Sequence, residues 1–108
     1  WEVSRGSVTE HDLDPLELGI PRAPIEALLG KDPEYNAQVI RAILAGEKSP
    51  ARDVVLLNAA AGLASFELAK DADQSRRPLV ERLREQLDLV DSGRASAKLD
   101  EWVAATNR

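Results

Sequence analysis

The side chains able to act as metal ligands or as general acids and bases form no convergent cluster in this sequence. His11, the single histidine, lies between Glu10 and Asp12. In a strand, successive side chains point to opposite faces, so His11 would share a face with neither neighbour. Asp100 and Glu101 are adjacent in a helical pattern, where neighbouring positions diverge by about 100°. We therefore expect solvated side chains at both places rather than a catalytic or metal site.

The glycine and arginine positions give no support to an anion-binding site. The six glycines stand at positions 6, 19, 30, 46, 62 and 93. This spacing contains no G-x-G phosphate loop. The densest basic group consists of Arg76, Arg77, Arg82 and Arg84, and Glu81 and Glu85 interleave with it. We expect salt pairing along a helix there, and the net charge of −5 without a basic stripe disfavours nucleic acid as a partner.

Other features of the composition limit the class of protein. The sequence has no Cys, so it offers neither a disulfide framework nor a thiolate nucleophile. It contains neither a signal peptide pattern nor a run of 18 apolar residues, and we predict a cytoplasmic protein. The 108 residues allow one domain at most. There is no Met, and Trp1 already lies in a strand-like pattern, so we expect part of a longer chain whose upstream part is missing.

Asn58 is the polar residue that is hardest to explain, because it interrupts an apolar stretch. Ser49 is a good N-cap and Pro50 suits the first helical position, so residues 49–69 are predicted to form a helix. Within residues 54–64, Asn58 is the one side chain able to hydrogen-bond. A helix that is apolar on almost every side belongs in a protein interior. We expect this helix to be the core element, buried against a sheet that the 108 residues do not contain.

Two roles are open for the buried amide of Asn58, which would cost about 1 to 3 kcal/mol without partners. In the structural role, which we favour, it bonds backbone groups of a neighbouring connector or strand end and fixes how the helix docks. In the functional role it reaches a ligand. Gly62 lies among alanines in the same helix and costs about 1 kcal/mol of helix propensity relative to Ala. We expect Gly62 to allow another backbone to pack closely.

The residues before this helix predict a hairpin and a connector. Residues 1–13 show two short extended runs around Ser4-Arg5-Gly6-Ser7, which is typical of a β-hairpin. A lone two-stranded hairpin is marginal in water, so its sheet should include strands from elsewhere. Residues 14–31 contain three prolines and form an irregular connector, with helical turns expected over residues 23–29.

The remaining residues predict three further helices. Asp32 followed by Pro33 starts a helix that Gly46 ends. The loop to the next helix has three residues, so residues 32–69 should form a tight helical hairpin. Residues 70–74 are polar and should be a solvated loop. Residues 75–106 then read as closing helices, with a break at Gly93 and fraying at Asn107.

Several short motifs resemble the C-terminal portion of the anthranilate phosphoribosyltransferase family in their order and spacing. They are Pro21-Arg22-Ala23, Asn36-Ala37, Leu44-Ala45-Gly46, Arg52-Asp53, Leu57-Asn58-Ala59-Ala60 and Asp91-Ser92-Gly93. The resemblance covers nearly the whole chain, although residues 70–84 are more polar and richer in Arg than expected. We assign structural roles to Arg22, Asn36, Asn58 and Gly62.

The resemblance implies an α/β fold of the nucleoside phosphorylase/phosphoribosyltransferase type, in which the hairpin and four or so helices are the C-terminal part of one domain. It implies magnesium-dependent transfer of phosphoribose from phosphoribosyl pyrophosphate (PRPP) to anthranilate, in tryptophan biosynthesis, by a homodimer. The family's glycine-rich loop, Lys-His-Gly-Asn type motif and Asp-Glu metal pair lie upstream of the position that matches Trp1. We therefore assign no catalytic, cofactor-binding or metal-binding residue here and predict that the chain alone is inactive.

Two other classes remain open. One is a non-catalytic acidic interaction module that presents the helix around Trp102 to a partner. The other is a fragment of a related pyrimidine nucleoside phosphorylase. An independent module should cover the 49–69 helix with its own residues, whereas a fragment should leave an apolar face of that helix and of the hairpin bare.

Overall fold

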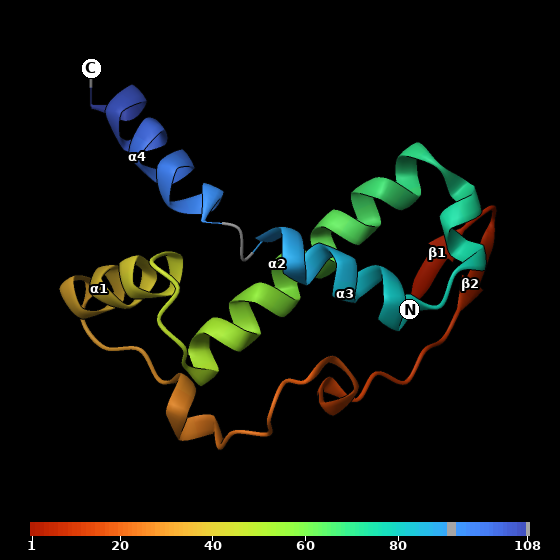
Figure 1. Ribbon diagram of the computed structural model, residues 1–108, viewed down its shortest axis with the longest axis horizontal. Helices are drawn as coiled ribbons and strands as arrows, with labels where there is room; N and C mark the ends of the chain where they lie inside the picture. The colour runs from red at the N-terminus through yellow and green to blue at the C-terminus, as the bar shows by residue number, and fades with distance from the viewer. Residues whose placement is uncertain (91–92, 108) are drawn as a thin grey trace.

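The computed structural model describes residues 1–90 and 93–107. The order of elements is β1 (Glu2–Ser4), β2 (Ser7–Thr9), the 3-10 turns η1 (Pro15–Leu18) and η2 (Ile25–Leu28), α1 (Pro33–Leu44), α2 (Pro50–Lys70), η3 (Ala72–Arg76), α3 (Leu79–Val90) and α4 (Arg94–Thr106). The predicted arrangement of an N-terminal hairpin followed by four helices is therefore confirmed (Figure 1). The motif residues Asp91 and Ser92 lie outside the described residues.

The hairpin forms because its turn residues accept a left-handed backbone. β1 and β2 pair antiparallel, with Val3 opposite Val8. Arg5 and Gly6 make the two-residue turn and have φ values of 53° and 74°, as a type I′ turn requires. The second strand ends at Thr9, so the predicted extended run to Leu13 is too long.

Capping residues set the start of α1 and α2 where the sequence predicted. The Asp32 carboxylate accepts a hydrogen bond from Tyr35 N at 2.8 Å, and Ser49 Oγ accepts one from Arg52 N at 3.2 Å. Pro follows each cap, where its missing N–H costs no helical bond. Gly46, at φ 90°, takes the left-handed conformation just after α1.

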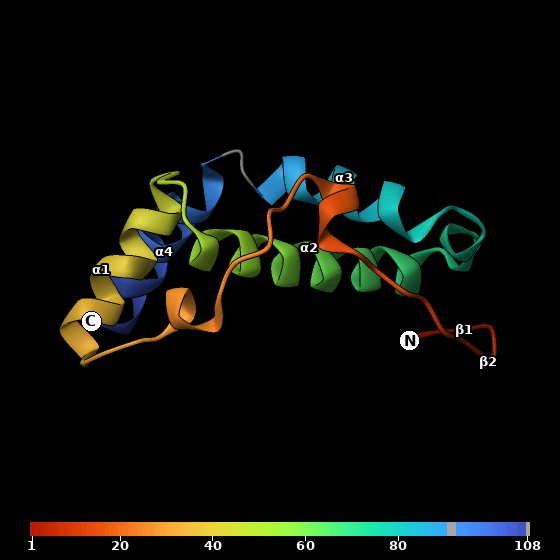
Figure 2. The ribbon, with the colours of Figure 1, turned by 90° about the horizontal axis from the view of Figure 1, so that it is seen from below.

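The long helix α2 crosses the molecule and packs mainly against α3, whereas α1 packs against α4 (Figures 1 and 2). The tight helical hairpin expected for residues 32–69 is thus not formed in the described part of the chain. The polar run after α2 is also more ordered than predicted, because it folds into η3. Its cap is Asp71, whose side chain accepts from Asp73 N.

The core that these elements enclose is small. The buried hydrophobic residues among those described are Ile43, Ala60, Ala64 and Leu83. The radius of gyration is 15.9 Å, compared with about 13 Å for a compact domain of this length. The chain is therefore more extended than a compact domain of its size.

One side of α2 is left uncovered. The exposed positions between its first and last turns are Val54, Val55, Asn58, Ala61, Gly62, Ser65, Phe66 and Ala69, which we call the bare face. At 3.6 residues per turn they fall within roughly 140° of the helix circumference. Figure 2 shows α3 along one side of α2 and an open side between η2 and the hairpin. Among the described residues α2 packs against α3, η3 and η2, so it is the central helix as predicted, but the bare face stays exposed.

Candidate functional site

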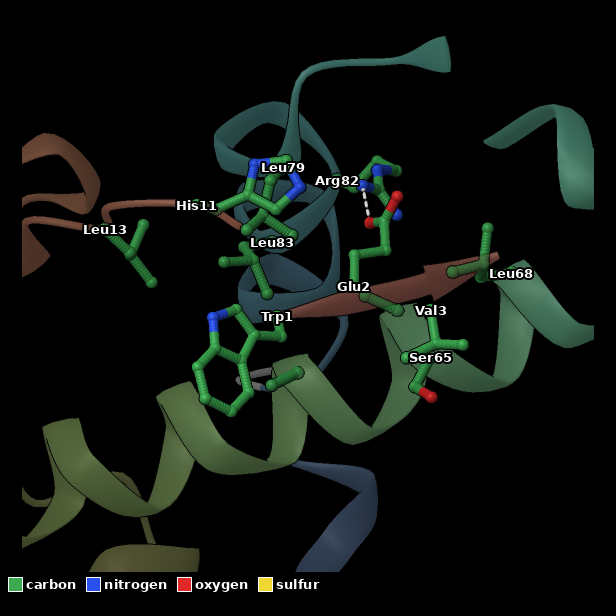
Figure 3. Close-up of a pocket in the computed structure, with 12 residues that line it drawn as sticks. Trp1, Glu2, Val3, His11, Leu13, Ser65, Leu68, Leu79, Arg82 and Leu83 are labelled. Carbon is green, nitrogen blue, oxygen red and sulfur yellow. Dashed lines mark hydrogen bonds and ion pairs between the residues drawn. The ribbon is translucent and has the colours of Figure 1, made fainter. Parts of the chain in front are cut away.

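A hollow of about 390 Å³ lies between the hairpin and helices α2 and α3 (Figure 3). Most of its wall is apolar and includes Leu13, Leu68, Leu79 and Leu83. Trp1 and Val3 reach toward it from the hairpin, although both are largely exposed. The polar side chains at its edge are Glu2, His11, Ser65 and Arg82.

A buried ion pair at the edge of the hollow joins Arg82 of α3 to Glu2 of β1. Their side chains are 5% and 11% exposed, so both charges are nearly removed from water. Charges desolvated to this degree are tolerated only as a pair. The contact neutralises Arg82 and fastens the hairpin to α3, so the hollow does not present a free cation to a ligand.

His11 is half-buried rather than solvated, which corrects the sequence prediction. It lies after the end of β2, so the alternation of strand faces that predicted its exposure does not apply. Its Nε2 atom is buried and has no hydrogen-bond partner among the described residues. No described group of three or more His, Asp, Glu or Cys side chains is arranged to hold a metal ion.

The acidic pair of α4 is solvated, as predicted. The side chains of Asp100 and Glu101 are 72% and 65% exposed, and they pair with different cations, Arg41 and Lys98. Two carboxylates that diverge in this way share no ligand.

The arginine group pairs differently from the prediction, which placed its partners along one helix. Arg82 reaches the hairpin, as described above, and Arg84 donates to the backbone oxygen of Glu17 at 2.7 Å. These long-range contacts hold the hairpin and η1 against α3. No local pattern could predict these contacts, because Glu2 and Glu17 are each more than 60 residues away from their partners.

Salt pairing does hold for Arg77, whose Nη1 donates to Glu85 Oε2 at 3.0 Å. This hydrogen bond and the attraction to Glu85 raise the pKa of Arg77. The same hydrogen bond is the main cause that lowers the pKa of Glu85. The pair is partly solvent-exposed and connects the residues just before α3 to its second turn.

Asn36 makes the clearest structural contact of the four residues singled out from the sequence. Its Oδ1 accepts from Lys31 N and its Nδ2 donates to Lys31 O, both at 3.0 Å. A Cβ on Gly30 would lie 2.9 Å from Asn36 Oδ1, so a larger residue at position 30 would push the Asn36 side chain out of this clasp. The clasp fixes the end of the connector on the first turn of α1.

Arg22 also acts within the connector. Its Nη2 donates to Asp14 Oδ2 at 2.8 Å, while Asp14 Oδ1 accepts from Leu16 N at 3.0 Å. The Arg22 side chain is 73% exposed, which makes the pair weak in water.

The structure places Asn58 and Gly62 on the bare face, where neither makes the predicted contact within the described chain. Asn58 is exposed, and its Nδ2 donates to Val54 O of its own helix at 2.8 Å rather than to the connector or a strand. A Cβ on Gly62 would meet no atom within 4 Å. Close packing at Gly62 thus has no counterpart among the described residues.

The comparisons with known proteins agree with this picture of a partial α/β domain. A family model described as "Glycosyl transferase family, a/b domain" matches residues 1–96. The chain belongs to this family. No solved structure matches it.

The relatives narrow the family further. The chain is 68% identical to the anthranilate phosphoribosyltransferase of Clavibacter michiganensis subsp. michiganensis, 57% to that of Leifsonia xyli subsp. xyli and 50% to that of Thermobifida fusca. Each match covers 98% of this chain but only 30% to 32% of the relative. The chain therefore spans about a third of the length of the curated relatives it matches. The predicted resemblance to this family is confirmed, and these names do not support the nucleoside phosphorylase alternative.

The structure also bears on the interaction-module alternative. Such a module should cover α2 with its own residues, yet the bare face is exposed and uncharged.

None of the helices in the described residues has the length and apolar character needed to cross a membrane.

Proposed function

We propose that this chain is the scaffold segment of an anthranilate phosphoribosyltransferase, the part that completes the α/β domain without contributing catalytic groups. The observation that carries the proposal is 68% identity over 98% of the chain to an enzyme of that name. A structural role is also supported by Asn36, whose side chain accepts from Lys31 N and donates to Lys31 O and so holds the connector against α1.

The whole enzyme would transfer phosphoribose from PRPP to the amine of anthranilate, in the cytoplasm, as a homodimer that uses Mg²⁺. The names of the relatives support the anthranilate substrate and the transfer of phosphoribose. By the family resemblance, the Asp-Glu metal pair and the glycine-rich loop lie upstream of the position that matches Trp1, so the ligands for Mg²⁺ and for pyrophosphate would come from other parts of such an enzyme. The role of this segment is to hold those parts in position.

A chimera tests this function. The matching segment of the Clavibacter michiganensis enzyme is replaced by this chain, and the chimera is expressed in a bacterial strain that lacks its own anthranilate phosphoribosyltransferase. We expect growth without tryptophan from the chimera and none from the 108-residue chain alone. A matched control carries the same segment with its residues in scrambled order. A chimera that accumulates in folded form without supporting growth would refute the proposal, and so would growth supported by the chain alone.

A further inference from the structure

A second hollow, which we call the recess, lies between α2, η3 and α3 and has a volume of about 330 Å³. Polar side chains form nearly all of its wall, whereas the hollow beside the hairpin is mainly apolar. The polar side chains that line the recess are Glu67, Gln74, Arg77, Arg82, Glu85 and Gln86. Since a water molecule takes about 30 Å³ of liquid volume, the recess has room for a small organic molecule.

The recess lies on the side of α2 that points away from the bare face. A helix turns by about 100° per residue, so Glu67 lies roughly 140° around α2 from Gly62 on the bare face. Ala64, which also lines the recess, lies roughly 160° from Gly62. A partner packed on the bare face would therefore leave the recess open.

Arg82 brings a donor without a partner to the recess. Its side chain is 5% exposed, and one of its terminal nitrogens pairs with Glu2 beside the hairpin. Its Nε atom is buried and has no hydrogen-bond partner among the described residues. A buried N–H without a partner costs free energy, so an acceptor that reaches Nε from the recess is favoured.

The charges around the recess are balanced. Each charged side chain of its wall belongs to an ion pair, and these pairs are Arg77–Glu85, Arg82–Glu2 and Glu67–Lys70. A lone anion or cation would add a charge without compensation, whereas a molecule with one charge of each sign adds none. The Glu67–Lys70 pair is about half exposed, so an ammonium group can displace Lys70 at little cost.

We propose that the recess is a binding site for a small zwitterion, namely an α-amino acid with a short polar side chain. Its carboxylate would accept hydrogen bonds from Arg82 Nε and the Gln86 amide, and its ammonium would donate to Glu67. Hydrogen bonds that involve charged groups are about twice as strong as neutral ones, which favours a zwitterion over a neutral polyol. The proposed function gives the recess no role, so this site is independent of it.

Titration of the isotope-labelled 108-residue chain with L-serine, followed by NMR, tests the site, because the side-chain amide signals of Gln74 and Gln86 report on the recess. We expect both signals to shift along one saturable curve with a millimolar Kd, as suits a ligand of few atoms. Acetate, methylammonium and glycerol each lack at least one of the two charges and should bind about tenfold more weakly or not at all. Shifts that do not saturate, or an equal affinity for any of these three compounds, would overturn the proposal.

A pair of matched variants locates the site. Glu67→Gln removes the partner of the ammonium and should raise the Kd for L-serine about tenfold. Glu34→Gln makes the same change on α1, at an exposed position away from the recess, and should change the Kd by less than about twofold. An equal effect of the two changes would overturn the assignment of the recess.

Equilibrium dialysis of the chimera described above against radiolabelled L-serine extends the test to a full-length protein. We expect a Kd within roughly twofold of that of the free chain, because the recess faces away from the surface on which the rest of the domain would pack. A folded chimera that binds no L-serine would overturn the proposal. Neither readout depends on activity, so an inactive chimera that binds L-serine would refute the proposed function and uphold this site.

Discussion

Replacing Arg82 with methionine tests the contact that fastens the hairpin to the helices. Arg82 and Glu2 are almost fully desolvated. At a separation of roughly 4 Å and an effective dielectric constant of about 20, their attraction is about 4 kcal/mol. Removing one partner of a buried pair costs about 3 to 5 kcal/mol, because the other charge is left without compensation. Since Val3 and Val8 bury little area, the hairpin can lift and rehydrate Glu2, and we expect a loss of about 3 kcal/mol in the free energy of unfolding.

The assay is urea unfolding of the 108-residue chain followed by far-UV circular dichroism, carried out as a double-mutant cycle. Arg82→Met and Glu2→Gln should each destabilise, while the double variant should lie closer to the wild type than the sum of the two losses. Arg77→Met is the matched control, because it removes an exposed pair and should leave the unfolding midpoint nearly unchanged. Additive losses in the cycle, or an equal loss for Arg77→Met, would refute the assignment of the Glu2–Arg82 pair as the clamp of the hairpin.

Three further predictions concern the core, the connector and pH. Leu83→Ala should cost about 2 to 3 kcal/mol in urea unfolding, the low end for a buried Leu, because the hollow already adjoins this side chain. Asn36→Ala removes two hydrogen bonds and should cost about 1 to 2 kcal/mol, with faster amide exchange around Lys31 as its signature; exchange unchanged from wild type would disprove the clasp. The lowered pKa of Glu85 means that its stabilising contribution is complete above the ordinary value of 4.5 and is lost as pH falls through the lowered value. Below pH 4.5, the urea midpoint should therefore fall less steeply with decreasing pH in Arg77→Gln than in the wild type. Parallel plots of midpoint against pH for the two proteins would contradict this prediction.

The helix starts and the hairpin turn could be predicted from the sequence, because they depend on neighbouring residues. The Asp32-Pro33 and Ser49-Pro50 pairs fixed two helix starts, because the cap hydrogen bond and the position of Pro depend only on neighbouring residues. The turn at Arg5-Gly6 was visible for the same reason. The packing of α2 was not predicted, because the short loop after α1 suggested α1 as its neighbour and no local pattern shows which helix α3 packs against.

Among the site residues, too, local features could be predicted from the sequence and long-range contacts could not. The Glu2–Arg82 clamp joins residues 80 positions apart, so no spacing rule could reveal it, and Arg82 was assigned to pairing along its own helix. Asn58 and Gly62 were noticed because they interrupt an apolar helix, but their predicted contacts are not made by the described residues. Both residues lie on the bare face of α2. Contacts made there by another part of the domain would account for their unusual types in an apolar helix and for the lack of partners among the described residues.

The most direct test of the central claim is the rate of phosphoribosyl transfer by the purified chimera, measured as loss of anthranilate in the presence of PRPP and Mg²⁺. We expect a rate within roughly tenfold of the Clavibacter michiganensis enzyme, because a scaffold segment leaves the reacting groups in place and a tenfold change is only about 1.4 kcal/mol of barrier. The 108-residue chain alone should transfer nothing. A folded chimera without activity, or measurable transfer by the chain alone, would contradict the scaffold role.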